Sequence, residues 1–402
     1  MEPSPGGMLK ATLLLASTLT VMANALIAPA LPELSLAFAQ TPHSDLLVRL
    51  VLTLPGLSIA ICAPIAGLIA DRFGRKGVLI FSLVLYGIAG GSGGLVDDLY
   101  TLLVMRALLG VAVAGIMTAC TTLAGDYFSG QQRTAFMGLQ ASFMFFGGMV
   151  FLGSAGMLAE LSWRAPFLVY LVSLPFIPLV LFYLYEPPRK PGAASPGETA
   201  GDWVPGRSVV FLYALVFGSM VIWYLIPTQL PFLLKDNLGA NNTSIGLIIA
   251  AMSLAAGLMA MQYRRIRARL SLTAILGLCF LIVGLSYLPL SLTTEYWRAI
   301  LGMVASGLGF GLFMPTVALW AVSLVPAHLR GRVVGGLTSA IYLGQFASPL
   351  LAQPLTSLRS IEWIFALAAI MMLVLSAGFW LATAWRRSRR PPLFEDKTSA
   401  SS

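Results

Sequence analysis

The chain has 402 residues, of which 58% are hydrophobic and 10% are charged, whereas about 25% of the residues in a soluble domain are charged. Its mean hydropathy of +0.85 excludes a single soluble core, because a soluble chain of this length would have to expose apolar surface to water. The formal net charge of +9 does not indicate nucleic-acid binding, because the placement of the basic residues follows a membrane topology.

Apolar runs of 18 or more residues recur along the chain. Each is long enough to cross ~30 Å of hydrocarbon as a helix, and a segment in lipid must satisfy its own backbone polar groups. We therefore predict an all-α, polytopic membrane protein with twelve transmembrane helices. With breaks at charges, prolines and glycines, they lie near residues 11–33, 46–70, 77–96, 99–125, 134–158, 165–186, 208–234, 243–262, 270–290, 294–324, 332–354 and 361–385.

Four parts follow from these boundaries. We predict an N-terminal six-helix bundle (1–186), a linker (187–207), a C-terminal six-helix bundle (208–385) and a tail (386–402). The linker is rich in Pro, Gly, Ala and Ser, a composition typical of flexible connections.

The basic residues predict the orientation in the membrane. Placing both termini in the cytoplasm puts 19 of the 25 basic residues on the cytoplasmic side. Five lie near outer helix ends, and Arg106 lies within a helix. We therefore expect both termini and the linker to be cytoplasmic, in a cell (inner or plasma) membrane.

The two halves share a faint repeat. An offset of 197 residues superposes Gly110 on Gly307 and Arg133 on Arg330, at matching places in the predicted topology. Two six-helix halves joined by a cytoplasmic linker are typical of secondary transporters, which bind their substrate at the midplane between the halves.

A charged decapeptide separates the second and third predicted helices. It reads Gly-Leu-Ile-Ala-Asp-Arg-Phe-Gly-Arg-Lys over residues 67–76. Bases are expected in a cytoplasmic loop, but that does not explain an acid between two glycines seven residues apart. A carboxylate at Asp71 is suited to bind a helix N-terminus, and Asp126, at the inner end of the fourth helix, is either a partner for the bases or a solvated helix end.

This loop and the whole-chain architecture resemble the major facilitator superfamily, specifically its twelve-helix drug:proton antiporter branch. The family signature Gly-x-Leu-Ala-Asp-Arg-x-Gly-Arg-Lys matches at seven fixed positions, with Ile69 in place of the leucine. The resemblance implies that the loop bridges helices two and eleven and holds the outward-facing state. The gating residues that it implies are Gly67, Asp71, Arg72, Gly74, Arg75, Lys76 and Asp126.

Two other helices bear on the resemblance. Arg106 and Gly110 in helix four resemble the family's Arg-x-x-x-Gly, which implies that Arg106 assists proton transfer or holds an anion. Because a lipid-facing arginine costs at least ~2.5 kcal/mol, Arg106 should face the cavity or a partner, or else snorkel outward. Helix five departs from the branch, since Phe151 and Leu152 replace its Gly-Pro.

No acid lies in the middle of a predicted helix, although proton-coupled exporters commonly need a carboxylate in the cavity. Glu33 is the nearest candidate, with a solvated helix end as the alternative. Arg49 lies four residues after Asp45, so an ion pair on one helix face could neutralise it. If Arg49 and Arg106 both face the cavity, the site favours an anionic or zwitterionic substrate.

Further polar and aromatic residues in the predicted helices could line the substrate site. For Asn24 and Gln140 the alternative is an interhelical hydrogen bond, and for the aromatic residues it is packing. The candidates for substrate binding or coupling are Asn24, Glu33, Arg49, Arg106, Gln140, Trp223, Tyr224, Gln229, Trp320, Tyr342 and Gln345.

From these observations we predict a proton-coupled exporter of a small organic molecule that works by alternating access. The alternative is uptake or facilitated transport of an organic anion or nutrient. An enzyme is not expected, because the two histidines, His43 and His328, fall on opposite sides of the predicted membrane. We expect no cofactor beyond a proton gradient, no metal, no nucleic-acid partner, and a monomer whose partners are its substrate and the lipid bilayer.

Overall fold

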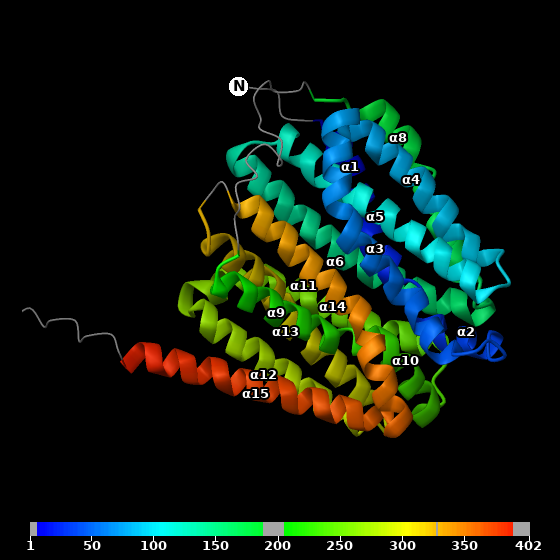
Figure 1. The fold of residues 1–402 in the computed structure, drawn as a ribbon, viewed down its shortest axis with the longest axis vertical. Coiled ribbons are helices and arrows are strands. Elements are labelled where there is room, and N and C mark those ends of the chain that lie inside the picture. Colours follow the sequence, from blue (N-terminus) through cyan, green and yellow to red (C-terminus); the bar gives the residue numbers. More distant parts are fainter. Residues whose placement is uncertain (1–5, 188–204, 327–328, 389–402) are drawn as a thin grey trace, which may run out of the picture.

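The computed structural model describes residues 6–187, 205–326 and 329–388, apart from the side chains of 24, 25, 134, 357 and 386–388. Within these residues the regular secondary structure is entirely helical (Figure 1). The predicted fold class, an all-α membrane protein with two six-helix bundles, is confirmed. Most of the predicted linker and tail lies outside the described residues, so their boundaries stay predictions.

Six spans form the N-terminal half, three of them interrupted by or ending in short 3-10 segments. Their helices are α1 (Gly7–Ala25), η1 (Ala28–Ala30), α2 (Leu31–Ala37), α3 (Ser44–Phe73), α4 (Arg75–Gly91), η2 (Ser92–Gly94), α5 (Leu99–Tyr127), α6 (Gly130–Leu161), α7 (Ala165–Leu168), η3 (Val169–Ser173) and α8 (Phe176–Tyr183).

Six further spans form the C-terminal half. They are α9 (Arg207–Trp223) continued by α10 (Leu225–Leu238), then α11 (Asn242–Arg269), α12 (Leu272–Ser291), α13 (Tyr296–Ser323), α14 (Arg330–Leu358) and α15 (Ile361–Ser388). The break between α9 and α10 has a local cause: Pro227 has no N–H to donate to the carbonyl of Trp223, where α9 ends.

Eleven spans in the described part of the chain are long and apolar enough to cross a membrane. The helix predicted near 332–354 is present as α14 but is not among the eleven. Two glutamines and several hydroxyl residues lower its hydropathy. Because α14 packs against α3 and α9, part of this polar surface lies against protein rather than lipid.

The halves meet along two pairs of helices, α3 with α14 and α6 with α11. We call the end of the molecule with residues 67–76 the motif end, and the end with residues 33–49 the distal end. Figure 1 shows α2 and α10, one from each half, side by side at the distal end, where they are in contact.

Small residues allow α6 and α11 to approach closely near the distal end. A Cβ atom on Gly246 would lie 2.7 Å from the carbonyl oxygen of Leu152 and 2.9 Å from the Cα atom of Gly156. Such backbone contacts are typical of small residues at membrane helix interfaces. The crossing therefore needs glycine on both helices.

We expect Gly246→Ala to weaken the closed distal end by about 1–3 kcal/mol, the usual cost of overpacking, because the helices must move apart. Spin labels on the exposed residues Leu161 and Leu292 would report a longer distance between the halves. The matched control is Gly153→Ala on α6, whose Cβ would meet only the Leu247 side chain at 3.7 Å. Equal distance distributions in both variants would contradict the role given to the crossing.

Candidate functional site

The loop predicted to act as a gate is a turn of one residue. The second span, α3, ends at Phe73 and α4 begins at Arg75, so Gly74 alone reverses the chain, with φ +95°. A side chain is strained in this conformation, and a Cβ there would also lie 3.1 Å from the Glu186 carboxyl carbon. The backbone conformation therefore favours glycine at position 74, and any side chain there would also press on the Glu186 carboxylate.

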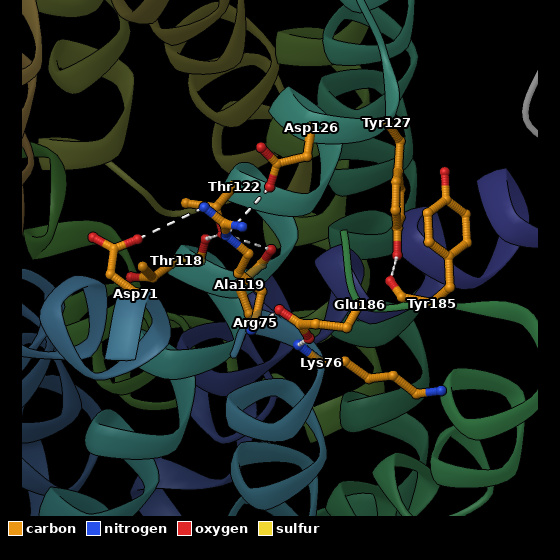
Figure 2. A network of polar contacts seen from close by, with 10 residues as sticks. All are labelled: Asp71, Arg75, Lys76, Thr118, Ala119, Thr122, Asp126, Tyr127, Tyr185 and Glu186. Atoms are coloured by element: carbon orange, nitrogen blue, oxygen red, sulfur yellow. Dashed lines mark hydrogen bonds and ion pairs between the residues drawn. The ribbon is translucent and has the colours of Figure 1, made fainter. Parts of the chain in front are cut away.

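Glu186 binds the N-terminus of α4 with both carboxylate oxygens (Figure 2). Its Oε1 accepts a hydrogen bond from the Arg75 N–H, and its Oε2 accepts one from the Lys76 N–H, each 2.8 Å long. In return, the Lys76 ammonium donates to the carbonyls of Leu181 and Leu184 at the end of the sixth span. The free backbone groups of two helix ends are therefore satisfied by each other's side chains.

Arg75 links this loop to α5. Its Nε lies 3.2 Å from a carboxylate oxygen of Asp126, an ion pair without hydrogen-bond alignment, and a terminal nitrogen lies 3.8 Å from Asp71 (Figure 2). For Asp126 the two alternatives are a partner for the bases and a solvated helix end. The structure shows the first, because its carboxylate lies beside Arg75. All these contacts lie within the N-terminal half.

Sequence reasoning missed Glu186. In this conformation Glu186 occupies the N-terminus of α4, while Asp71 lies beside Arg75, so the expectation that Asp71 binds a helix N-terminus stays a prediction. A signal was present: Glu186 is the last residue of the sixth predicted helix, which in an antiparallel bundle ends on the same side as the loop.

Two further residues of the loop, Arg72 and Gly67, have different surroundings. The Arg72 guanidinium lies over the Phe73 ring at 5.7 Å. A Cβ on Gly67 would meet only the Thr118 methyl group at 3.9 Å, an ordinary contact. A larger residue would therefore fit at position 67, so close packing of α3 against α5 does not explain the glycine there.

The distal end carries an ion pair between the halves. Glu33 of α2 accepts a hydrogen bond from the Lys235 ammonium of α10, and both side chains are partly exposed. The other oxygen of Glu33 is buried without a hydrogen-bond partner among the described residues. Glu33 is thus part of the contact between the halves, rather than a solvated helix end.

Arg49 lies in the same interface and is only 5% exposed. Its Nε donates to the Gln229 side-chain oxygen of α10 at 3.2 Å, and its guanidinium lies 4.2 Å from the centre of the Phe232 ring. The ion pair expected with Asp45 is replaced by a 2.6 Å hydrogen bond to the Asp45 backbone carbonyl. No ion pair neutralises Arg49 within the described residues.

Closer to the middle, α3 and α14 cross at Gly56. A Cβ on Gly56 would lie 3.1 Å from the Tyr342 carbonyl oxygen and 3.9 Å from the Gln345 Cβ. The Tyr342 hydroxyl also reaches the Met117 sulfur of α5 at 3.9 Å, and the Gln345 side-chain oxygen is buried without a described partner. The structure therefore brings Arg49, Gln229, Tyr342 and Gln345 to helices along one interface.

The arrangement of inter-half bonds is one-sided. Bonds between described residues of the two halves run from the distal end to the middle; the partners are Glu33–Lys235, Arg49–Gln229, Ala159–Asn242, Glu160–Thr243, Ala60–Ser339 and Met117–Tyr342. Beyond Ala60 towards the motif end, large apolar side chains of α3 such as Ile61 and Ile65 are exposed.

Arg106 does not face this interface; of the alternatives for its surroundings, the structure shows a partner within the N-terminal half. It is fully buried inside the N-terminal half, where it donates to the Gly90 carbonyl at 3.2 Å. Its guanidinium lies 4.6 Å and 4.9 Å from the centres of the Phe167 and Tyr170 rings. Arg106 therefore neither snorkels nor joins Arg49; it is held by a carbonyl and two aromatic faces.

The structure places the other candidates in different surroundings. Gln140 donates to the Ser17 hydroxyl at 2.6 Å, the interhelical alternative. Trp223 packs against the rings of Phe310 and Phe313. Tyr224, half-buried at the α9–α10 break, lies near Tyr342 of α14 and near Tyr170 of the N-terminal half, so it belongs with the interface candidates. Trp320 lines a groove near the motif end, and the side chain of Asn24 lies outside the described residues.

Comparisons with known proteins agree with this architecture. The family model of the Major Facilitator Superfamily matches residues 13–233 and 212–401. In a solved structure titled as the inward open conformation of the xylose transporter XylE from E. coli, the fold is similar with a TM-score of 0.75 and 13% identity, covering 96% of this chain and 97% of that one.

Curated relatives span nearly the whole chain. The tetracycline resistance protein, class C, of Escherichia coli is 26% identical over 396 residues, covering 90% of this chain and 95% of the relative. The multidrug resistance protein MdtG of Salmonella arizonae is 24% identical over 380 residues, covering 92% and 94%. The 3-(3-hydroxy-phenyl)propionate transporter of Escherichia coli is 25% identical over 345 residues, covering 82% and 83%.

Replacing Glu186 with alanine should lower the free energy of unfolding by about 0.5–2 kcal/mol, the usual cost of losing an N-cap. Thermal unfolding of the purified protein measures the loss. Glu295→Ala is the control, because Glu295 precedes α13 without capping its N-terminus. If Glu186→Ala leaves the midpoint temperature of unfolding unchanged, water replaces the carboxylate at the N-terminus of α4 without loss of stability.

Reversing one charge of the Glu33–Lys235 pair should favour separation of the distal ends. For a partly exposed pair we expect a shift of about 0.2–1 kcal/mol, measured with the labels at Leu161 and Leu292. The double exchange, Glu33→Lys with Lys235→Glu, should restore the closed distance, because the attraction is restored. If the double exchange behaves like the single ones, the attraction between these charges does not hold the distal end.

Proposed function

The chain belongs to the Major Facilitator Superfamily and is a multi-pass membrane transporter rather than an enzyme, and from this membership we propose that it exports a small organic molecule in exchange for protons. Transport would follow alternating access, in which two halves rock around a site near the midplane. The observation that supports this proposal is the position of the bonds between the two halves. They hold the distal end of the molecule closed.

We interpret this conformation as open towards the motif end. The bonds described between the halves lie from the distal end to the middle, and the loop network of Arg75, Asp126 and Glu186 stays within the N-terminal half. Opening the distal end would break Glu33–Lys235 and Arg49–Gln229. In the opposite state, we propose, Asp71 and Arg75 of the loop contact the C-terminal half.

The orientation that we propose places the motif end in the cytoplasm of a cell membrane. It rests on the distribution of basic residues, since the loop, the C-terminal end of α11 and the start of α9 all carry arginine at this end. The conformation would then be open to the cytoplasm, ready to take up a substrate for export.

The names of relatives support export. The relatives named for tetracycline resistance and multidrug resistance match over at least 90% of this chain. In the drug:proton branch a proton gradient supplies the energy, so we propose proton coupling, without a resident cofactor and with a monomer as the working unit. Glu33 is the proposed coupling carboxylate, because it lies in the interface with one oxygen unpartnered.

The chemistry of the interface favours an anionic or zwitterionic substrate. Arg49 is buried between the halves, without an ion pair in the described part of the chain. Its direct contacts, Gln229 and Phe232, are neutral, and the carboxylates of Asp45 and Asp236 act on the guanidinium only from beyond ion-pair distance. A carboxylate entering the interface could replace Gln229 on the guanidinium, which binds carboxylates well.

A second candidate function is uptake of an organic anion. The same unpaired Arg49 favours it, as does the relative named as a 3-(3-hydroxy-phenyl)propionate transporter. The two functions share the substrate charge and differ in the direction of net transport.

Flux measurements in vesicles of both orientations test the proposal. We expect everted vesicles with an imposed proton gradient to accumulate a substrate among tetracycline and aromatic carboxylates, and an uncoupler to abolish accumulation. Arg49→Gln should raise the KM for a carboxylate, while Arg359→Gln, which removes an exposed charge at the distal end, should not.

Accumulation in right-side-out vesicles alone would support uptake instead. Transport that persists without a gradient would overturn proton coupling. Transport of lipophilic cations but no carboxylates, unchanged by Arg49→Gln, would overturn the substrate class.

A further inference from the structure

The C-terminal half contains a groove that the transport cycle does not use. It lies at the motif end between α9, α12, α13 and α15, with a volume of about 580 Å³. In the N-terminal half, the corresponding first span, α1, packs against α5 and α8 as well as α6, whereas α9 packs extensively against α14 and only lightly against α13. The groove fills the space that α9 leaves beside α13 and α15.

The walls of the groove are apolar and open to the outer surface of the bundle. Phe211 of α9 and Val374 of α15 are 54% and 65% exposed although both line the groove. The edge of the Phe211 ring meets Trp320 at the back, with ring centres 6.2 Å apart. Since α9 and α15 are membrane-spanning by length and hydropathy, this opening faces the hydrocarbon of the bilayer.

The mouth of the groove at the motif end is polar and positively charged. Arg207 and Ser208, the first residues of α9, line it and are exposed. Neither side chain has a hydrogen-bond or ion-pair partner among the described residues. The N-cap residue, Gly206, has no side chain to cap α9, so the N–H groups of Arg207 and Ser208 have no side-chain cap, and the positive end of the helix adds to the attraction of the guanidinium for an anion.

The polar mouth and apolar floor are separated along the membrane normal. On α15 the lining runs from Ala382, near the motif end, to Val374, a depth of about 12 Å at 1.5 Å per residue. A ligand that fits must therefore have an anionic head at the membrane surface and an apolar tail directed to the bilayer centre. Charge and orientation together match a lipid of the leaflet at the motif end.

We propose that this groove binds one anionic phospholipid, with its phosphate at Arg207 and the N-terminus of α9 and an acyl chain between α9 and α15. Attraction to the guanidinium provides the preference for the anionic headgroup, and burial of the chain provides affinity independent of the headgroup. This assignment does not depend on the direction of transport or on the transported substrate.

The test uses the full-length protein, purified in detergent, with phosphatidylglycerol and phosphatidylcholine of identical acyl chains. Native mass spectrometry counts the lipids retained. We expect one phosphatidylglycerol to be retained several-fold more strongly than phosphatidylcholine. Arg207→Gln should abolish this preference, whereas Arg359→Gln, the same charge change at the distal end, should preserve it.

A second variant tests the acyl chain. A Cβ on Gly378 would meet nothing within 4 Å, so Gly378→Leu fills the groove and should reduce retention of both lipids. Gly138→Leu, at an equally open and exposed position on α6, should leave retention unchanged.

Three results would overturn the proposal. They are equal retention of the two lipids by the unmodified protein, a phosphatidylglycerol preference that survives Arg207→Gln, and displacement of the lipid by a short fatty acid that the protein then transports. The last result would make the groove a substrate site.

Discussion

Two helix bundles in a bilayer gain little from hydrophobic attraction to each other, because lipid tails are as apolar as their side chains. Adhesion between the halves must therefore come from close backbone packing and from a small number of polar bonds. In this protein the packing is concentrated where Gly156 meets Gly246 and where Gly56 meets α14. The polar bonds, from Glu33–Lys235 to Ser339–Ala60, lie over the same part of the interface. A contact of this kind can separate without unfolding either bundle.

The motif end shows the complementary arrangement. There the charges bind within one half: Glu186 holds the start of α4, Lys76 holds the end of the sixth span, and Arg75 lies beside Asp126. This network fixes the position of the loop as a rigid unit of the N-terminal half. A rigid, charged loop is suited to meet the other half when the motif end closes, which is the role that the family resemblance implies for it.

The two membrane arginines illustrate how one residue type serves different purposes. Arg106 is enclosed by a carbonyl and two aromatic rings, so its charge is stabilised by neighbours within one bundle. Arg49 lies between the bundles and donates to a neutral amide. Only the second can change partners when the halves move, and this difference is the basis for the proposed substrate class.

The sequence by itself determined the fold class, the twelve helices and the place of the charged loop at 67–76, because apolar run length and the decapeptide act locally. It also identified Asp126 and Glu33 as candidates, since acids are scarce in this chain. Only the tertiary structure decided their partners. Glu186 lies 111 residues from Arg75, and Lys235 lies 202 residues from Glu33, so no local pattern connects them. The surroundings of Arg106 likewise depend on which helices pack against α5. The sequence alone does not show which neighbour lies against each face of that helix.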